Sequence, residues 1–299
     1  MTMKSWISAM RPRTLPLALA CIGMGAFLAA DANAFRWSIF GLSALTTILL
    51  QILSNLANDY GDSQHGADSD DREGPQRAVQ SGAISAAAMR RAMGIFVILC
   101  LVSGITLLYV SLGFAWETFG FFFVLGLLSI GAAITYTASR KPYGYVGLGD
   151  LSVIIFFGIV AVLGSSYLYE PILRWDYVLP ALSCGFFATA VLNVNNIRDI
   201  ESDKKAGKRS IPVRIGRKAA VGYHTFLLVG GLTTAGLYTA LHWQSPWQLL
   251  FLLAAPLLFI NGKAVATKTD AQALDPFLKQ MALTTLLFVL TFGIGLLLG

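Results

Sequence analysis

The stretch ILLQILSNLANDYGD at residues 48–62 combines an apolar run with two carboxylates at its end. A carboxylate beside a lipid-length apolar segment costs free energy unless it has a partner or a function. A second stretch, AVLNVNNIRDIESD at residues 190–203, ends in the same way. Together the two stretches predict long membrane helices that carry acidic groups to the membrane surface.

The composition of the chain indicates an integral membrane protein. Hydrophobic residues make up 56% of the 299 residues, charged residues 13%, and the mean hydropathy is +0.65. Soluble domains carry about twice that fraction of charge. Crossing a bilayer takes about 20 apolar helical residues. The chain is therefore predicted to be all-α, a polytopic membrane helical bundle with nine spans at about 14–30, 37–57, 93–113, 118–137, 148–168, 177–196, 219–241, 246–262 and 278–298.

The basic residues predict the orientation in the membrane. Twenty of the 22 Lys and Arg residues fall before the first span, in the loops on the same side, or at their edges, whereas Arg36 and Arg174 fall on the other side. The positive-inside rule then places the N-terminus and both acidic loops in the cytoplasm, and the C-terminus outside a bacterial inner membrane. This asymmetry accounts for the net charge of +6 without a nucleic-acid partner.

We expect residues 1–299 to form one integral membrane domain, because the polar stretches at 58–91 and 197–218 are too short for a soluble one. The apolar run after Arg11 and Arg13 has some features of a cleavable signal peptide. We expect it to remain uncleaved and to form the first span. Three pairs share an offset of 137, which indicates an internal duplication unless the biased composition produced it by chance: Asn58 with Asn195, Asp62 with Asp199, and Arg77 with Arg214.

Oxygen ligands follow helical spacing in both acidic stretches. Asn58 and Asp62 share a face if the helix continues, whereas Asp59 points elsewhere. Asn195, Asp199 and Asp203 would form an unbroken stripe of one residue per turn. Such oxygens suit Mg²⁺, which takes one or two carboxylates together with water and substrate phosphate. The alternative is that these residues cap helices and form turns.

Basic residues flank both stretches and could bind phosphoryl oxygens. The same residues are also ordinary for the inner loops of a membrane protein. Arg77 is the candidate that could stabilise charge on a leaving diphosphate. Candidate substrate-binding residues, together with the amide of Asn55, are Arg72, Arg198, Lys204 and Lys208.

A third loop on the same side joins the fourth and fifth spans. Tyr136 and Arg140 lie one turn apart there, and the ring could border an electron-poor intermediate. Tyr143 and Tyr145 read as interfacial anchors. Asp150, near the start of the fifth span, is either functional or a helix cap.

These motifs together resemble the UbiA superfamily of intramembrane prenyltransferases. The segments that carry the resemblance span the chain: RPRTLP at 11–16, SNLANDYGD at 54–62, ITYT at 134–137, PYGYVGLGD at 142–150 and NNIRD at 195–199. Within the superfamily, the segments are most similar to members that prenylate 1,4-dihydroxy-2-naphthoate in menaquinone synthesis.

The resemblance implies Mg²⁺-dependent transfer of a polyprenyl group from its diphosphate onto the naphthoate ring, with loss of CO₂. It also implies that Asn58 and Asp62 hold one metal ion, and that Asp199 and Asp203 hold the other. Asp59 and Asn195 are further candidates. Arg140 stands where the superfamily usually has Lys. Gly66 stands where it often has Asp, and Asp68 is a substitute ligand.

Two alternatives stay open at this point. A sister enzyme that prenylates 4-hydroxybenzoate, haem or a tetrapyrrole would share the acidic loops and differ in its acceptor pocket. A secondary transporter would also have internal repeats and polar residues in the membrane. However, a transporter should place those residues near the bilayer midplane, and here they cluster at one surface.

Overall fold

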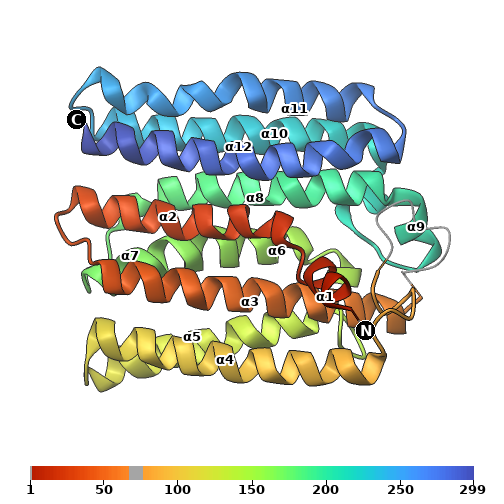
Figure 1. The fold of residues 1–299 in the computed structure, drawn as a ribbon. Helices are drawn as coiled ribbons and strands as arrows, with labels where there is room; N and C mark the ends of the chain where they lie inside the picture. Colours follow the sequence, from red (N-terminus) through yellow and green to blue (C-terminus); the bar gives the residue numbers. More distant parts are fainter. Residues whose placement is uncertain (1, 67–76) are drawn as a thin grey trace.

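The computed structural model describes residues 2–66 and 77–299, and the described residues contain helices and no strand (Figure 1). The longer elements begin and end near the predicted boundaries. In chain order the elements are α1 (Met3–Met10), η1 (Pro12–Thr14), α2 (Leu15–Asp31), α3 (Trp37–Gln64), α4 (Ala86–Leu112), α5 (Trp116–Thr135), η2 (Tyr143–Val146), α6 (Gly149–Val153), η3 (Ile154–Gly164), α7 (Ser165–Tyr169), η4 (Trp175–Tyr177), α8 (Val178–Arg198), α9 (Ile200–Lys205), α10 (Ile211–Leu241), η5 (Pro246–Ala254), α11 (Ala255–Thr267) and α12 (Ala271–Leu297).

Within the described residues, nine helical segments are long and apolar enough to cross a membrane, which confirms the predicted bundle of nine spans. The fifth of these, Gly149–Tyr169, is mostly the π-helix η3 between two short α-helices. Three helices start earlier than the hydropathy predicted: α4 at Ala86, α10 at Ile211, with a break at Gly216, and α12 at Ala271. Polar residues extend these helices beyond the apolar core, so hydropathy alone misplaces their ends.

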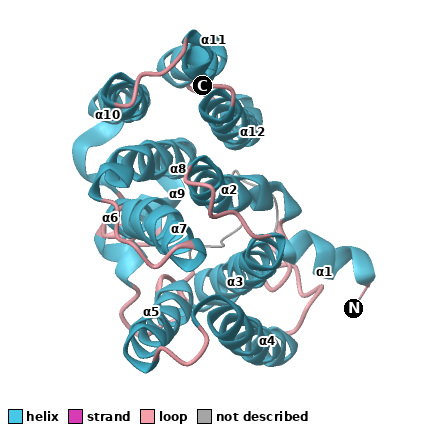
Figure 2. Cartoon of the chain, turned by 90° about the vertical axis from the view of Figure 1, so that its left-hand side faces the viewer, coloured by secondary structure: helices cyan, strands magenta, loops and turns pink. Residues whose placement is uncertain are grey.

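The helices pack around a central pair. Seen along the bundle, α2 and α8 lie between the group α10, α11 and α12 and the group α3, α4 and α5 (Figure 2). The spans that contain α8 and α2 are accordingly among the most buried, whereas α5 has little buried surface. The N-terminus and α9 lie at one end of the bundle and the C-terminus at the other (Figure 1). We call the end with α9 the acidic end.

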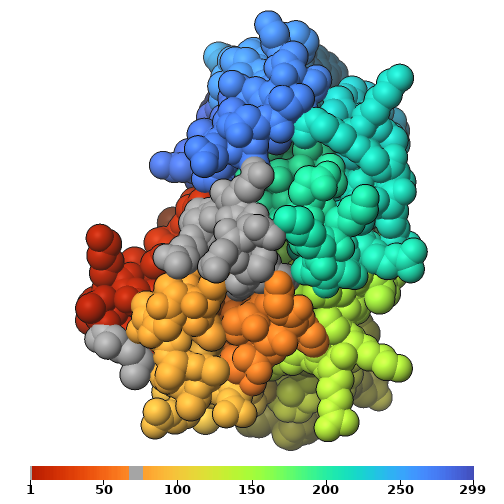
Figure 3. Space-filling model, turned by 90° about the vertical axis from the view of Figure 1, so that its right-hand side faces the viewer, coloured from red at the N-terminus to blue at the C-terminus, as the bar shows by residue number. Residues whose placement is uncertain are grey.

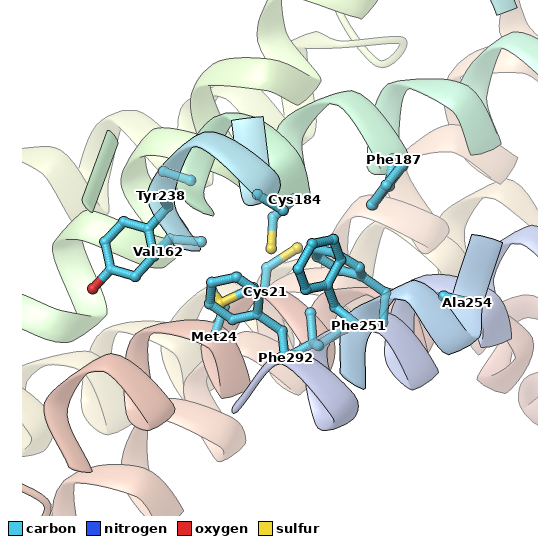
Figure 4. Close-up of a cluster of buried hydrophobic side chains, with 14 of the residues drawn as sticks. Cys21, Met24, Val162, Cys184, Phe187, Tyr238, Phe251, Ala254 and Phe292 are labelled. Carbon is cyan, nitrogen blue, oxygen red and sulfur yellow. The ribbon is translucent and has the colours of Figure 1, made fainter. Parts of the chain in front are cut away.

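Aromatic side chains fill the core between the central pair and the C-terminal helices. Phe187, Phe251 and Phe292 meet there beside two buried thiols, Cys21 and Cys184 (Figure 4). Phe288 packs edge-on against Phe187, with ring centroids 4.8 Å apart. All three cysteines of the chain are free and buried. Because lipid tails are as apolar as these rings, close packing is the main source of their contribution.

At the acidic end the two motif helices behave differently. α3 continues without a break through the first motif to Gln64. α8 instead ends at Arg198, and Asp199, with φ −97° and ψ 14°, is the junction with α9. The predicted unbroken stripe of the second motif is therefore wrong in this detail: Asp203 lies on a separate short helix. The amide of Asp203 still donates to the Asp199 carbonyl at 2.8 Å, so the two acids stay one turn apart.

The aromatic core generates a prediction about stability. Phe288→Ala would leave a cavity among packed rings and lower the free energy of unfolding by about 3–5 kcal/mol. Thermal unfolding in detergent measures this as a lower Tm. The matched control is Phe259→Ala, because Phe259 is 72% exposed on the outer surface. Equal Tm values for the two variants would contradict the assignment of the core.

Candidate functional site

A cavity of about 480 Å³ runs from the acidic end into the bundle. Its polar end is lined by Asn58, Asp62, Arg77, Tyr136, Asn195 and Lys208. Its body lies between α3, α4, α5 and η3 and is lined mostly by apolar side chains such as Leu101, Phe123 and Phe156. Figure 3 looks onto the acidic end, where the orange C-terminal part of α3 lies next to the teal segment that contains α9. The cavity thus joins a charged end to an apolar body.

Asp62 is the carboxylate of the first motif that faces the cavity. Arg77 lies 3.4 Å from one of its oxygens, and the hydroxyl of Tyr145 donates to the other at 2.9 Å. One turn earlier, the side-chain oxygen of Asn58 accepts from the hydroxyl of Thr137 at 3.0 Å. The continued helix of α3 therefore presents Asn58 and Asp62 on one face, where both line the cavity.

Asp59 points away from that face and has a different role. Its two carboxylate oxygens accept from the backbone amides of Ala78 and Val79, each at 3.1 Å, and the residue is 1% exposed. These bonds fix the segment that carries Arg77. Asp59 does not line the cavity, so its geometry is that of a positioning residue and does not fit the metal ligand that the motif suggested.

The second motif centres on a buried ion-pair network. Arg198 donates to both oxygens of Asp199 at 2.7 Å, to the side-chain oxygen of Asn195 at 2.9 Å, and to Asp275 at 2.5 Å. Arg13 then lies 3.5 Å from the other oxygen of Asp275. Asn195 lines the cavity, whereas Asp199 and Arg198 lie behind it. Arg198 therefore holds Asp199. The predicted substrate-binding role would require Arg198 to face the cavity, and it does not.

Asp203 is paired with the cavity-lining cation of its own loop. Lys208 lies 3.1 Å from one oxygen of Asp203, and the Ser210 hydroxyl donates to the other at 3.2 Å. Burial raises the pKa of Asp203, although Lys208 opposes this. Burial also disfavours the Lys208 ammonium, but Asp203 and Asp62 outweigh burial and raise the pKa of Lys208. Lys208 therefore keeps its charge beside both motifs.

Tyr136 lines the cavity, and its predicted partner does not. Burial raises the pKa of Tyr136, so the phenol stays protonated at neutral pH. Arg140, one turn further on, is exposed and lies outside the cavity lining. The helix of α5 ends at Thr135, so Arg140 belongs to a turn that leads away from the cavity. Lys208 contributes to the charge around Tyr136 instead.

Of the remaining predicted residues, one lines the cavity and the other described ones do not. Asn55 lines the cavity and its amide group donates to the Met10 carbonyl and the Thr14 hydroxyl, both at 2.9 Å, so it anchors the N-terminal segment. Lys204 is exposed and outside the lining. Arg214 bonds backbone carbonyls and does not repeat the contact of Arg77 with a motif acid. Arg72 and Asp68 lie outside the described residues.

Three residues that contribute to the site were not predicted from the sequence. Tyr145, read as an anchor, contacts Asp62. Asp275 holds Arg198 from the start of α12, where nothing in the sequence marked it. Asn196 lines the cavity, and its buried side-chain oxygen has no hydrogen-bond partner among residues 2–66 and 77–299. Asn196 stands inside the NNIRD segment, and its position in the motif was the signal that could have found it.

The donor set suits a hard cation that binds together with substrate. The first motif places the carboxylate of Asp62 and the amide of Asn58 in the cavity lining, and the second motif places the amides of Asn195 and Asn196 there. Among the described residues, no group of three His, Cys, Asp or Glu side chains is arranged to hold a metal ion alone. Mg²⁺ needs no such cage, because it commonly takes one or two carboxylates and completes its shell with water and phosphate oxygens. The residues present therefore fit Mg²⁺ as a partner of a phosphorylated substrate.

Comparison with known proteins identifies the family. The profile of the UbiA prenyltransferase family matches residues 18–286. The chain belongs to this family. Its sequence is 47% identical to the 1,4-dihydroxy-2-naphthoate octaprenyltransferase of Escherichia coli (strain K12) over 291 residues, which cover 96% of this chain and 94% of that one. We therefore describe the chain as a multi-pass membrane prenyltransferase.

Solved structures of the family share the fold. A UbiA homologue from Aeropyrum pernix K1 superposes with a TM-score of 0.70 at 16% identity, covering 95% of this chain and 97% of that one. A UbiA homologue from Archaeoglobus fulgidus, bound to DMAPP and Mg²⁺, has a TM-score of 0.60 at 17% identity, covering 97% and 99%. At these identities the likeness concerns the helical architecture.

The contacts of Asp59 generate a prediction about positioning. Asp59→Asn keeps one acceptor and leaves one of the two backbone amides without a partner, which costs about 1–3 kcal/mol. Because the freed segment carries Arg77, we expect both a lower Tm and a higher KM for prenyl diphosphate. The control is Asp176→Asn at the other end of the bundle, where the acid pairs with His242. A wild-type KM in Asp59→Asn would contradict this positioning role.

Proposed function

We propose that the protein transfers a polyprenyl group from polyprenyl diphosphate to 1,4-dihydroxy-2-naphthoate with decarboxylation, giving the hydroquinone form of demethylmenaquinone, diphosphate and CO₂. The observation that carries this proposal is the cavity itself, which joins Asp62, Arg77 and Lys208 to an apolar body inside the bundle. A polyprenyl diphosphate has the same two parts. The 47% identity to a 1,4-dihydroxy-2-naphthoate octaprenyltransferase supports the choice of acceptor.

The charged end suits the diphosphate. Arg77 and Lys208 reach the cavity from the two motif loops and are each paired with an acid of their own motif. Their ammonium and guanidinium groups can bind phosphoryl oxygens and stabilise the charge that develops on the leaving diphosphate. The cavity lining extends along α3 from Asp62 at the polar end to Ser43, which is roughly 28 Å at 1.5 Å per residue. This length suits several isoprene units.

Mg²⁺ is the metal that we propose for this site. Asn58 and Asp62, which line the cavity, would hold one ion. Asp199 and Asp203, which lie next to the lining residues Asn195 and Lys208 and outside the lining itself, would hold the other, with Asn195 beside it. Bound Mg²⁺ supplies neutralisation of the diphosphate oxygens. Arg198 and Lys208 occupy the same carboxylate oxygens in the structure, so metal ions and these cations compete for them. The Mg²⁺-bound structure of the archaeal UbiA homologue supports the choice of metal.

In the proposed reaction, the bond between the allylic carbon and the diphosphate oxygen breaks, and the electron pair leaves with diphosphate. The electron-rich naphthoate ring attacks the allylic carbon and forms the new carbon–carbon bond. Loss of the carboxyl group as CO₂ and restoration of the aromatic ring complete the exchange. Tyr136 and the apolar lining exclude water from the allylic carbon, which protects the cationic centre from hydrolysis.

The proposed location is the bacterial inner membrane, with the acidic end in the cytoplasm. The basic residues gather at that end, as the positive-inside rule requires. The N-terminus would then be cytoplasmic and the C-terminus outside, and the structure has these termini at opposite ends of the bundle. Water-soluble diphosphate would leave the cavity toward the cytoplasm.

The direct test is an assay of the purified protein with Mg²⁺, polyprenyl diphosphates of several lengths and competing acceptors, read by mass spectrometry. We expect prenylated, decarboxylated naphthol and released diphosphate, both lost without divalent metal. Asp62→Ala and Asp199→Ala, folded and inserted, should lower turnover by about 100-fold or more. Preference for 4-hydroxybenzoate would favour the sister enzyme, and no diphosphate release with any acceptor would contradict the proposal.

A second prediction separates the cations that line the cavity from those that do not. Arg77→Ala and Lys208→Ala should lower kcat/KM for prenyl diphosphate by about 100-fold, because each removes a charge from the cavity. Arg140→Ala and Lys204→Ala are the matched controls on exposed residues, and should stay within about threefold because exposed charges are screened by salt. The reverse order of effects would show that the diphosphate binds elsewhere.

A further inference from the structure

The segment 142–149 follows α5 and ends at the first residue of α6, and it contacts Asp62, the loop that carries Lys208, and Tyr136. We call it the bridge segment. The hydroxyl of Tyr145 donates to Asp62 of the first motif at 2.9 Å, and the residue is 8% exposed. The main-chain carbonyl of the same Tyr145 accepts from the amide of Arg209 at 2.8 Å. Arg209 directly follows Lys208. One residue therefore links Asp62 to the loop that carries Lys208.

A second clamp holds the bridge segment to that loop. The Arg214 guanidinium donates to the Val146 carbonyl at 2.5 Å and to the Arg209 carbonyl at 3.0 Å. Gly147 stands between these groups with φ +77°, and a Cβ atom there would lie 2.9 Å from the Arg209 carbonyl oxygen. A residue other than glycine is disfavoured at this φ and lacks space. The bridge segment is thus fitted closely to the second loop.

The bridge segment also supports Tyr136, the aromatic group of the cavity. The amide of Gly144 donates to the Tyr136 carbonyl at 3.1 Å. At the other end of the segment, a Cβ atom on Gly149 would lie 2.8 Å from the Tyr136 hydroxyl. The ring therefore packs directly against the segment. Asp62, Lys208 and Tyr136, which line one cavity, are all held from this short stretch of chain.

We propose that Tyr145 is a positioning residue that fixes Asp62 and sets its distance from the Lys208 loop. The inference rests on the proposed function, since it assigns Asp62 to the metal site. A carboxylate that binds metal needs its orientation fixed by an outer hydrogen bond, and losing such a partner typically weakens metal binding about 10- to 100-fold. A Tyr that merely anchored the loop would affect the amount of folded protein and leave the metal affinity of the folded protein unchanged.

The test is Tyr145→Phe, which keeps the ring and removes the hydroxyl. Mn²⁺ binding to purified protein, with inorganic diphosphate present, is measured by the electron paramagnetic resonance of free Mn²⁺. We expect the Kd for Mn²⁺ to rise about tenfold. In the prenyl-transfer assay, the Mg²⁺ concentration at half-maximal rate should rise about tenfold too, with most of the rate restored at saturating Mg²⁺.

The matched control is Tyr223→Phe, which removes another Tyr–Asp hydrogen bond, 3.1 Å from Tyr223 to Asp150, outside the cavity lining. It should lower Tm and leave the Kd for Mn²⁺ at the wild-type value. A wild-type Kd in folded Tyr145→Phe would overturn the inference, and so would an equal rise in the Tyr223→Phe control.

Three further outcomes keep the test decisive. If Tyr145→Phe does not fold, Gly147→Ala is the second variant, because its added Cβ displaces the Lys208 loop from the other side of the clamp. This variant should also raise the Kd for Mn²⁺. An unchanged Kd would overturn the inference. If the wild-type protein binds Mn²⁺ but makes no prenylated product, the proposed function fails while the comparison of Kd values still tests Tyr145. If the wild-type protein binds no Mn²⁺, both fail.

Discussion

The polar end of the bundle depends on one constraint, the need of each buried carboxylate for a partner. Leaving a buried charge unpaired costs about 3–5 kcal/mol, so an acid next to a membrane core persists only if it is held. Asp62 has Arg77, Asp199 has Arg198, and Asp203 has Lys208. Asp59 has two backbone amides instead of a cation. These partners decide how the loops fold and which charges reach the cavity.

The same constraint ties distant parts of the chain together. Asp275, from the last helix, completes the pairing of Arg198, and Tyr145, from the third loop, completes that of Asp62. The central helices α2 and α8 hold this arrangement through apolar packing further down the bundle. The charged site at the surface and the apolar core in the membrane are therefore built from the same helices. A prenyltransferase needs both regions in one cavity, because its substrate is charged at one end and apolar along the rest.

The sequence predicted the architecture well, because membrane spans have a strong local signal. Apolar length gave nine spans, and helical spacing brought Asn58 and Asp62 to one face of α3. The spacing also indicated correctly that Asp59 points elsewhere. Local patterns could not give contacts that join separate loops. Tyr145 looked like any interfacial tyrosine, and Arg140 stood at a familiar motif position, yet the first contacts Asp62 and the second is exposed. The internal duplication stays a prediction, and Arg77 and Arg214 make different contacts.

The central claim is that the two acidic motifs form one site. A double-mutant cycle on kcat/KM for prenyl diphosphate, with Asp62→Asn, Asp203→Asn and the double variant, tests it most directly. Residues that act on one substrate group as a unit are strongly non-additive. We expect the double variant to be no more than about tenfold worse than the worse single variant. Losses that multiply in full would show two independent sites and contradict the account.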